Sequence, residues 1–291
     1  MSTDQAERPS EFPPQQQEPP GSTAAMTPTP DHGERSYRGS GRMTGLRTLI
    51  TGGDSGIGRA VAIAFAREGA DVAITHLPEE ADDAESTVAL VTEAGRRGVA
   101  YAADLRTQEA CADVVNRAVS ELGGLDVLVN NAGYQMAREG GIESISPQRL
   151  DRIMKTNLYA LFWMTQAVLP HLQAGGCILN NSSIQAYDPS VSLLDYAATK
   201  AAINNATVNL AAELGPRGIR VNAVAPGPIW TPLQPATQPE EKVTKFGQDT
   251  PLGRAGQPAE VAPAFVFLAS PGDASYVSGT VLGVTGGKPV F

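Results

Sequence analysis

From Leu46 onward, short apolar runs alternate with longer amphipathic stretches. Continuous apolar runs are typical of buried parallel strands, and a 3.6-residue period is typical of the helices between them. The runs predict strands at Arg47–Thr51, Asp71–Thr75, Val99–Ala103, Val127–Asn130, Gly176–Asn180, Arg220–Ala225 and Thr280–Val284. The other stretches predict helices at Gly58–Glu68, Ala81–Arg96, Gln108–Leu122, Pro147–His171, Asp195–Leu214 and Pro258–Leu268. We therefore expect an α/β fold, a single doubly wound parallel sheet of seven strands with helices on both faces.

Residues 1–43 differ from this pattern, since they are rich in Pro, Gln, Ser, Gly and charge. Ordering such a segment costs conformational entropy and returns little hydrophobic burial. We expect a flexible N-terminal tail over residues 1–43 and one catalytic domain over residues 44–291. Two alternatives stay open: a polyproline ligand for a partner domain, and an arm at Pro30–Arg42 that lies across the folded domain or a neighbouring subunit.

Charge and cysteine content narrow the function classes. With 22 basic and 31 acidic residues the net charge is −9, which repels nucleic acid and anionic membranes, so neither is an expected partner. Cys111 and Cys177 lie far apart without paired histidines, which argues against a disulfide framework or a bound metal. No apolar run reaches the roughly 18 to 20 residues of a membrane span, and the N-terminus lacks a leader pattern. We expect a soluble, cytoplasmic protein.

A glycine-rich loop follows the first predicted strand. The strand RTLIT runs directly into GGDSGIGRAVAIAF, which contains Gly52, Gly56 and Gly58 and continues as a helix. Glycines at such positions allow a sharp turn and a close approach of the backbone to a pyrophosphate, and the helix N-terminus offers free N–H groups to an anion. An ordinary strand-to-helix connection is the alternative. In this context the loop predicts nucleotide binding in a Rossmann-type fold.

A second group of residues suggests proton transfer. Tyr196 and Lys200 stand at i and i+4 of a predicted helix, so they share one face, and the lysine charge would lower the tyrosine pKa from about 10. Ser183 ends the strand CILNNSS, thirteen residues before Tyr196. Ser182 competes for that role, but the interval favours Ser183. A lone Tyr-x-x-x-Lys is weak evidence, and neither His76 nor His171 stands in a recognisable triad.

Taken together, these motifs resemble the short-chain dehydrogenase/reductase family. The resemblance rests on the spacing T-G-x-x-x-G-x-G, on VNNAG at Val129–Gly133, on the Ser-Tyr-Lys set and on the segment APGPIWT. It covers about residues 44–291. The segments TGGDSGIGRA, SSIQAY and LLDYAATKAAI are similar to a bacterial branch described as aldehyde reductases or general stress oxidoreductases, which says little about the substrate.

The resemblance implies an NAD(P)-dependent oxidoreductase (EC 1.1.1.-) that transfers hydride between nicotinamide and an alcohol, aldehyde or ketone. It implies that Tyr196 gives or takes the proton, that Lys200 binds the ribose and lowers the tyrosine pKa, and that Ser183 stabilises the carbonyl. Asn157 matches the helix asparagine that holds a proton-relay water. The resemblance also implies a homotetramer.

Further positions match the cofactor site of the family. Taken singly, VNNAG is also a plausible turn and Asp104 a plausible helix cap; their joint order favours the cofactor role. The expected cofactor-binding residues are Gly52, Asp54, Ser55, Gly56, Ile57, Gly58, His76, Asp104, Leu105, Asn131, Ala132, Gly133, Tyr196, Lys200, Pro226, Gly227, Ile229 and Thr231.

Cofactor preference and substrate contacts follow less directly. NAD-preferring relatives carry an acidic residue at the end of the second strand, and here His76 stands there. Because His76 carries no negative charge to repel a 2′-phosphate, NADP(H) is favoured over NAD(H). Against this, no Arg or Lys follows to bind the phosphate, and Glu79 and Glu80 are close. The Pro-containing region at about residues 228–256 predicts a substrate lid. Candidate substrate residues are Tyr134, Gln185, Tyr187 and Trp230.

Two other functions are compatible with a fold of this kind. A nucleotide-binding regulatory or scaffold protein would retain the fold and use its tail or an oligomer surface for binding, but the intact Ser-Tyr-Lys-Asn set argues against it. An epimerase or dehydratase acting on a sugar nucleotide would use similar residues but usually needs a larger C-terminal domain.

Overall fold

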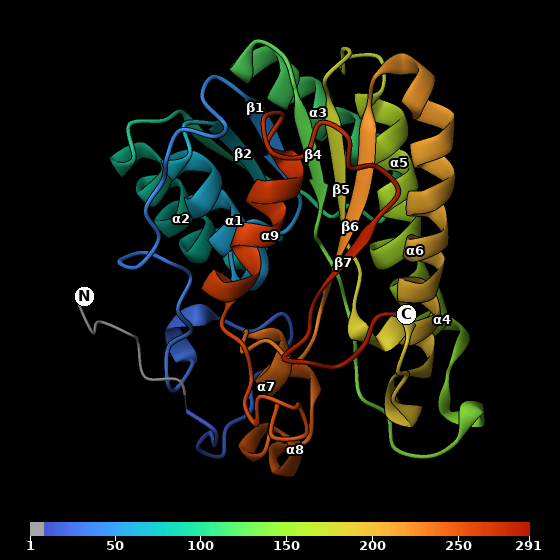
Figure 1. Ribbon diagram of the computed structural model, residues 1–291. Coiled ribbons are helices and arrows are strands. Elements are labelled where there is room, and N and C mark those ends of the chain that lie inside the picture. Colours follow the sequence, from blue (N-terminus) through green and yellow to red (C-terminus); the bar gives the residue numbers. More distant parts are fainter. Residues whose placement is uncertain (1–8) are drawn as a thin grey trace.

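The computed structural model describes residues 9–291 and contains one parallel sheet (Figure 1). The order of the strands is β3-β2-β1-β4-β5-β6-β7. The change of direction between β1 and β4 makes the sheet doubly wound, which confirms the predicted fold class. The strands are β1 Arg47–Ile50, β2 Asp71–His76, β3 Gly98–Ala102, β4 Val127–Asn130, β5 Cys177–Asn181, β6 Arg220–Pro226 and β7 Val281–Val284.

Helices cover both faces of this sheet, and each face has its own apolar core. One core joins α1, α2 and α9 to the strands, and the other joins α3, α5 and α6 to the opposite face. The helices are α1 Gly56–Arg67, α2 Ala81–Glu93, α3 Gln108–Leu122, α4 Pro147–Met154, α5 Ala160–Val168, α6 Leu194–Leu214, α7 Leu233–Thr237, α8 Glu240–Thr244 and α9 Pro258–Ala269. Among residues 9–291 no helix combines the length and apolar character that a membrane span requires.

The helix predicted at Pro147–His171 is interrupted. Between α4 and α5 the chain forms a π-helical turn at Lys155–Tyr159. Such turns insert one extra residue into a helix and often occur at functional sites. Asn157 lies in this turn and is buried, so the irregularity sets the direction of its side chain.

Residues 228–256, here called the lid, leave the sheet after β6 and return to it. Both ends are held together, because Trp230 N–H donates to the Gly256 carbonyl at 2.9 Å and Gly256 N–H donates to the Pro228 carbonyl at 2.9 Å. Between these ends the lid forms α7 and α8, which lie below the sheet in Figure 1.

Residues 9–43, here called the arm, differ from the predicted flexible tail. Phe12, Met26 and Met43 are buried, and the arm passes from the side of α1 to the lid (Figure 1). These isolated apolar side chains are buried against apolar surfaces of the folded domain. The segment is therefore ordered although it has no hydrophobic periodicity of its own. The predictions for residues 1–8 lie outside the described residues.

Candidate functional site

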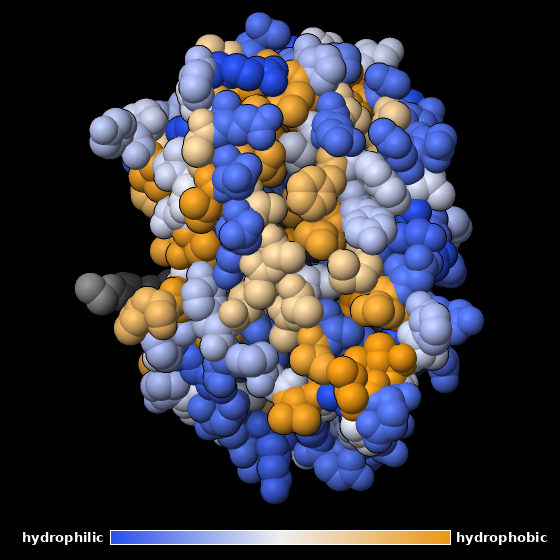
Figure 2. All heavy atoms as spheres, turned by 90° about the vertical axis from the view of Figure 1, so that its right-hand side faces the viewer, coloured by the Kyte–Doolittle hydropathy of each residue, from blue (hydrophilic) through white to orange (hydrophobic). Residues whose placement is uncertain are grey.

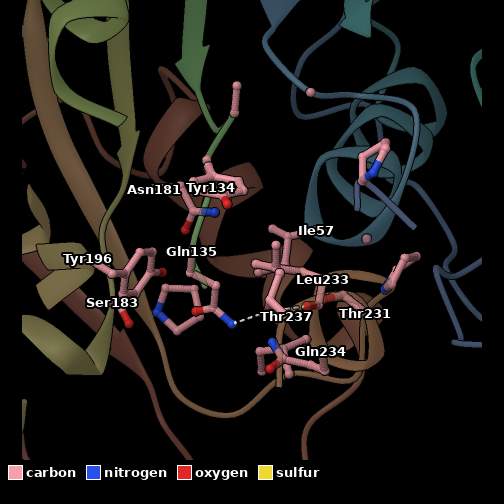
Figure 3. A pocket seen from close by; sticks show the side chains of 18 of the residues that line it. Ile57, Tyr134, Gln135, Asn181, Ser183, Tyr196, Thr231, Leu233, Gln234 and Thr237 are labelled. Carbon is pink, nitrogen blue, oxygen red and sulfur yellow. Dashed lines mark hydrogen bonds between the residues drawn. The ribbon is translucent and has the colours of Figure 1, made fainter. Parts of the chain in front are cut away.

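A cleft of about 1080 Å³ opens at the carboxyl ends of the strands. Ligands of open α/β sheets bind at this edge, where the strand order reverses. Its lining comes from the glycine-rich loop, the ends of β2 to β6, the start of α6 and the lid. Figure 3 shows Tyr196 and Ser183 on one side of this cleft and Thr231, Leu233 and Gln234 on the other.

The glycine-rich loop has the backbone geometry that the sequence predicted. Gly52 and Gly56 have φ of +60° and +50°, which side chains disfavour. A Cβ at Gly58 would collide with the carbonyl oxygen of Gly52. Ser55 precedes α1 without a side-chain capping bond, so the first N–H groups of α1 have no side-chain acceptor from their cap. This cradle fits a pyrophosphate.

Asparagines connect the loop to the neighbouring strands. Asn131 Nδ2 donates to the carbonyl oxygens of Thr51 at 2.9 Å and Gly52 at 2.8 Å. Asn181 Nδ2 donates to Asn131 Oδ1 at 2.8 Å. Hydrogen bonds between side chains and backbone therefore join the ends of β1, β4 and β5. Sequence reasoning missed Asn181; the signal was its position at a strand end in CILNN, parallel to Asn130 and Asn131 in VLVNN.

Tyr196, Ser183 and Lys200 meet in the cleft. Ser183 and Tyr196 lie beside one another, and the Ser183 hydroxyl is near enough to lower the tyrosine pKa; Ser183 Oγ accepts the Gln185 N–H at 3.1 Å. Lys200 Nζ lies 5.4 Å from the centre of the Tyr196 ring. Ser182 instead points to Asn204 and the Lys200 carbonyl. The two hydroxyls can contact one substrate oxygen.

The electrostatics of this trio differ from the expectation. Burial raises the pKa of Tyr196 to about 12, although the Ser183 hydroxyl lowers it. Burial also lowers the pKa of Lys200 to about 7. Desolvation disfavours each charged form. The direction of the tyrosine shift is thus opposite to the lowering expected from the lysine, because burial is its largest cause.

Asn157 is held rigidly beside the cleft. Its Oδ1 accepts the Tyr134 N–H at 2.7 Å, and its Nδ2 donates to the Tyr134 carbonyl at 2.9 Å and to Thr199 Oγ1 at 3.1 Å. It lines a small cavity next to the cleft. Its side chain thus joins the segment after β4 to α6.

The end of the cleft next to β2 carries acidic groups. Burial and the neighbouring Asp54 charge raise the pKa of Glu80 to about 7, and burial raises that of Asp54 to about 6. Asp54 is buried, and its Oδ2 has no hydrogen-bond partner among the described residues. His76 Nδ1 pairs with the Leu77 carbonyl at 2.8 Å. Two carboxyl groups that share a site cannot both ionise easily.

The cleft brings together most of the residues singled out from the sequence. Those that line it are Gly52, Asp54, Ser55, Gly56, Ile57, His76, Asp104, Leu105, Asn131, Ala132, Gly133, Tyr134, Ser183, Gln185, Tyr196, Lys200, Pro226, Gly227, Ile229 and Thr231. Gly58 and Asn157 support it from behind.

Two substrate candidates are misplaced. Trp230 is fully buried, stacked on Phe12 of the arm and outside the cleft lining. Tyr187 is partly buried and also lies outside the lining. Adjacency in sequence to a site residue did not place their side chains in the cleft. Within residues 9–291 no cluster of His, Cys, Asp or Glu has the arrangement of a metal site.

Comparison with known proteins agrees with this geometry. A protein-family model described as Enoyl-(Acyl carrier protein) reductase matches residues 52–288. The chain is 53% identical to the uncharacterized oxidoreductase YhxD of Bacillus subtilis (96% of this chain, 94% of the relative), and 46% identical to the glucose and ribitol dehydrogenase of Daucus carota (96% and 98%).

Among solved structures, a short-chain dehydrogenase from Burkholderia cenocepacia in complex with NADP matches with a TM-score of 0.79 at 37% identity. The match covers 84% of this chain and 98% of that one. The chain therefore belongs to the short-chain dehydrogenase/reductase family of NAD(P)-dependent oxidoreductases that act on CH–OH groups.

Proposed function

We propose that residues 44–291 form one catalytic domain that reduces a small carbonyl compound, with Tyr196 as the acid. The observation that carries this proposal is that Tyr196 and Ser183 lie beside one another at the cleft, with Lys200 on the same helix face as Tyr196. The glycine-rich loop, whose backbone fits a pyrophosphate, lines the same cleft.

Each residue of the site has its own role in the proposed reaction. Bound NAD(P)H would supply the hydride to the carbonyl carbon. Ser183 donates a hydrogen bond to the carbonyl oxygen, and Tyr196 transfers its hydroxyl proton to that oxygen as negative charge develops there. Asn157 keeps the segment after β4 in place against α6. In the reverse direction Tyr196 takes the proton from the alcohol.

The protonation state of Tyr196 suits the reduction. A tyrosine whose pKa is raised to about 12 carries its proton at neutral pH, so it can act as an acid without prior ionisation. Oxidation needs the tyrosinate, which is scarce at that pH, so the oxidation rate should be lower near neutrality than at alkaline pH.

We propose NADP(H) as the preferred cofactor. Its preference over NAD(H) should grow as the pH falls. His76 ends β2 without a negative charge, and the related structure from Burkholderia cenocepacia holds NADP. Opposed to this, Glu80 and Asp54 line the same end of the cleft. Their ionised forms repel a 2′-phosphate, and their raised pKa values of about 7 and 6 place this ionisation near neutral pH.

We further propose a hydroxylated substrate, an aldose, a ketose or the corresponding polyol. The part of the cleft between Tyr196 and the lid is rich in amides and hydroxyls. Gln135 Nε2 donates to Thr237 Oγ1 at 3.0 Å (Figure 3), and Gln185 exchanges hydrogen bonds with Ser190. Such groups pair with substrate hydroxyls. The Daucus carota relative is named for glucose and ribitol.

We also propose a homotetramer. Large apolar side chains are exposed on the α4–α6 side of the molecule: Leu150, Tyr159, Phe162, Leu194 and Val208. Figure 2 shows that side, where apolar side chains gather between polar ones. Phe267, Tyr276 and Phe291, in the last part of the chain, are exposed as well. A closed tetramer with two kinds of two-fold contact would cover side chains of both groups. Sedimentation of a monomer at micromolar concentration would refute this.

The decisive test of the reaction is Tyr196→Phe, which removes the hydroxyl and keeps the ring. We expect turnover of short aldehydes and aldoses to fall by at least about 100-fold and the affinity for NADPH and NADH, followed by fluorescence titration, to stay within about three-fold. Turnover near the wild-type rate would contradict the assigned acid. Loss of cofactor binding together with turnover would show that the hydroxyl is needed to hold the cofactor, and the fall in turnover would then not identify Tyr196 as the acid.

A further inference from the structure

The first half of the arm is anchored on the lid by an aromatic pair. The rings of Phe12 and Trp230 stack with centres 3.7 Å apart and planes inclined by 10°. Phe12 is 4% exposed and Trp230 is fully buried. Met26 and Val243 complete this apolar cluster. The cluster forms a small core of its own, separate from the two that flank the sheet.

Backbone hydrogen bonds follow the same path. Phe12 N–H donates to the Thr244 carbonyl at 3.1 Å, and Gln17 N–H donates to the Pro235 carbonyl at 3.0 Å. Trp230 Nε1 donates to the Pro28 carbonyl at 2.8 Å. Both lid helices, α7 and α8, are therefore joined to residues 9–28.

The same half of the arm also reaches the nucleotide side of the cleft. Gly21, with φ of +86°, packs so closely on Pro232 that a Cβ would lie 2.9 Å from its carbonyl oxygen. Two residues later, Thr23 N–H donates to Asp83 Oδ2 on α2 at 3.0 Å. The chain from residue 19 to residue 23 thus spans from the lid to α2.

This span borders the cofactor site itself. Pro19 and Pro20 line the cleft together with Gly56 and Ile57 of the glycine-rich loop. Gly56 in turn approaches Thr231 at the start of the lid, where a Cβ on Gly56 would lie 3.1 Å from the Thr231 methyl carbon. Lid, loop and arm therefore meet on one side of the cleft.

We propose that residues 9–28 form the outer wall of the dinucleotide site and hold the lid in place, so that a bound nicotinamide dinucleotide leaves only after this half of the arm detaches. Phe12 is a positioning residue, since its stacking on Trp230 keeps Pro19 and Pro20 at the cleft. This inference rests on the proposed cofactor function. It assigns part of the site to a segment more than two hundred residues away from the lid in sequence.

The test compares Phe12→Ala and Gly21→Ala with the control Tyr37→Phe. The control removes the hydrogen bond from the Tyr37 hydroxyl to Glu68, in the half of the arm that lies away from the cleft. Each variant of the full chain is loaded with NADPH or NADH, and the release rate is measured by stopped-flow fluorescence on displacement with oxidised cofactor. Hydrogen exchange of residues 228–256 without nucleotide gives a second readout.

We expect release to accelerate at least ten-fold in Phe12→Ala and Gly21→Ala and less than two-fold in Tyr37→Phe. The KM for the cofactor should rise in the first two variants, while kcat should not fall. Exchange of the lid amides should accelerate in the same two variants only. If Phe12→Ala does not fold, Gly21→Ala provides the test.

A folded Phe12→Ala or Gly21→Ala variant with unchanged release would overturn the proposal. Equal acceleration in Tyr37→Phe would also overturn it, since general loosening would then explain the effect. If the wild type binds neither cofactor, the proposed function fails, and lid exchange still decides whether residues 9–28 hold the lid.

Discussion

The ammonium nitrogen of Lys200 lies 2.7 Å from the main-chain carbonyl oxygen of Asn181, at the end of β5. The side chain of Asn181 holds Asn131, so Lys200 is part of the network that shapes the glycine-rich loop. Lys200→Met removes the donor and the charge while it keeps most of the apolar chain. We expect kcat/KM to fall by about 10²- to 10⁴-fold and cofactor affinity to weaken.

Lys155→Met is the matched control, because Lys155 is half-buried, pairs with Asp151 of α4 and lies outside the cleft lining. Steady-state kinetics and cofactor titration check both variants. Retention of kcat/KM within ten-fold in Lys200→Met would remove Lys200 from the reaction.

The two directions of the reaction should respond differently to pH. Reduction uses protonated Tyr196, whose pKa is raised to about 12, so this step should not lose its acid between pH 6 and 10. Oxidation uses the tyrosinate, whose fraction grows about ten-fold for each pH unit below the pKa. Initial rates in both directions across this range test the expectation.

Ser183→Ala refines that experiment. The Ser183 hydroxyl lowers the pKa of Tyr196, so its loss should move the rise of the oxidation rate to higher pH. An oxidation rate that levels off below pH 8 in the wild type would mean that the tyrosine ionises far more easily than its burial implies.

Cofactor preference should depend on Glu80. The group faces Asp54, Asp83 and His76, and its carboxylate forms as the pH rises through about 7. Ionisation adds a negative charge where a 2′-phosphate would lie, so the affinity for NADPH relative to NADH should fall, by roughly ten-fold, between pH 6 and 8. Glu80→Gln should abolish most of this change.

Glu85→Gln on the exposed face of α2 is the control for this prediction, since it alters the net charge equally. Fluorescence titrations of both cofactors at pH 6, 7 and 8 provide the ratio. A ratio that is independent of pH in the wild type would exclude Glu80 from cofactor selection.

Residues 37–42 of the arm should stabilise the folded protein through their hydrogen bonds to Glu68, which follows α1. Burial by itself would raise the pKa of Glu68, but hydrogen bonds from Arg42, the Tyr37 hydroxyl and the Ser40 N–H outweigh it and lower the pKa to about 2. We expect Glu68→Gln to lower the free energy of unfolding by about 3 kcal/mol, measured by urea denaturation. Glu93→Gln, on an exposed position, should change it by less than about 0.5 kcal/mol.

The pH dependence of this contribution has a definite sign. The pKa of Glu68 is lower in the folded state than its unfolded value of about 4.3, so the stabilisation is complete above that value. It should be lost as the pH falls from about 4.5 toward 2. The difference between wild type and Glu68→Gln should shrink over the same interval.

The sheet and its glycine-rich loop were predictable because their signals are local. Each strand is a short apolar run with a turn on either side, and the strand Val127–Asn130 was predicted at its exact ends. The loop was predictable because Gly52 and Gly56 need φ values that other residues avoid. The pairing of Tyr196 with Lys200 needed only the helical period.

What the sequence did not reveal depends on contacts between distant segments. Phe12 is one apolar residue among Pro, Gln and Glu, and its burial depends on Trp230, which the chain supplies from the lid. For the same reason Trp230 was wrongly expected in the substrate pocket. The pKa of Tyr196 was misjudged because burial, which no local pattern reports, is the largest cause of its shift.

The stacking of Phe12 on Trp230 also has a consequence for biosynthesis. The two residues are 218 positions apart in the chain, so at roughly 5 to 20 residues per second the ribosome makes Trp230 some 10 to 45 s after Phe12. During that interval Phe12 and Met26 have no surface to cover. A segment of Pro, Gln and charged residues with only isolated apolar side chains stays soluble until the lid has been synthesised. A composition typical of a disordered tail therefore suits a segment that docks last.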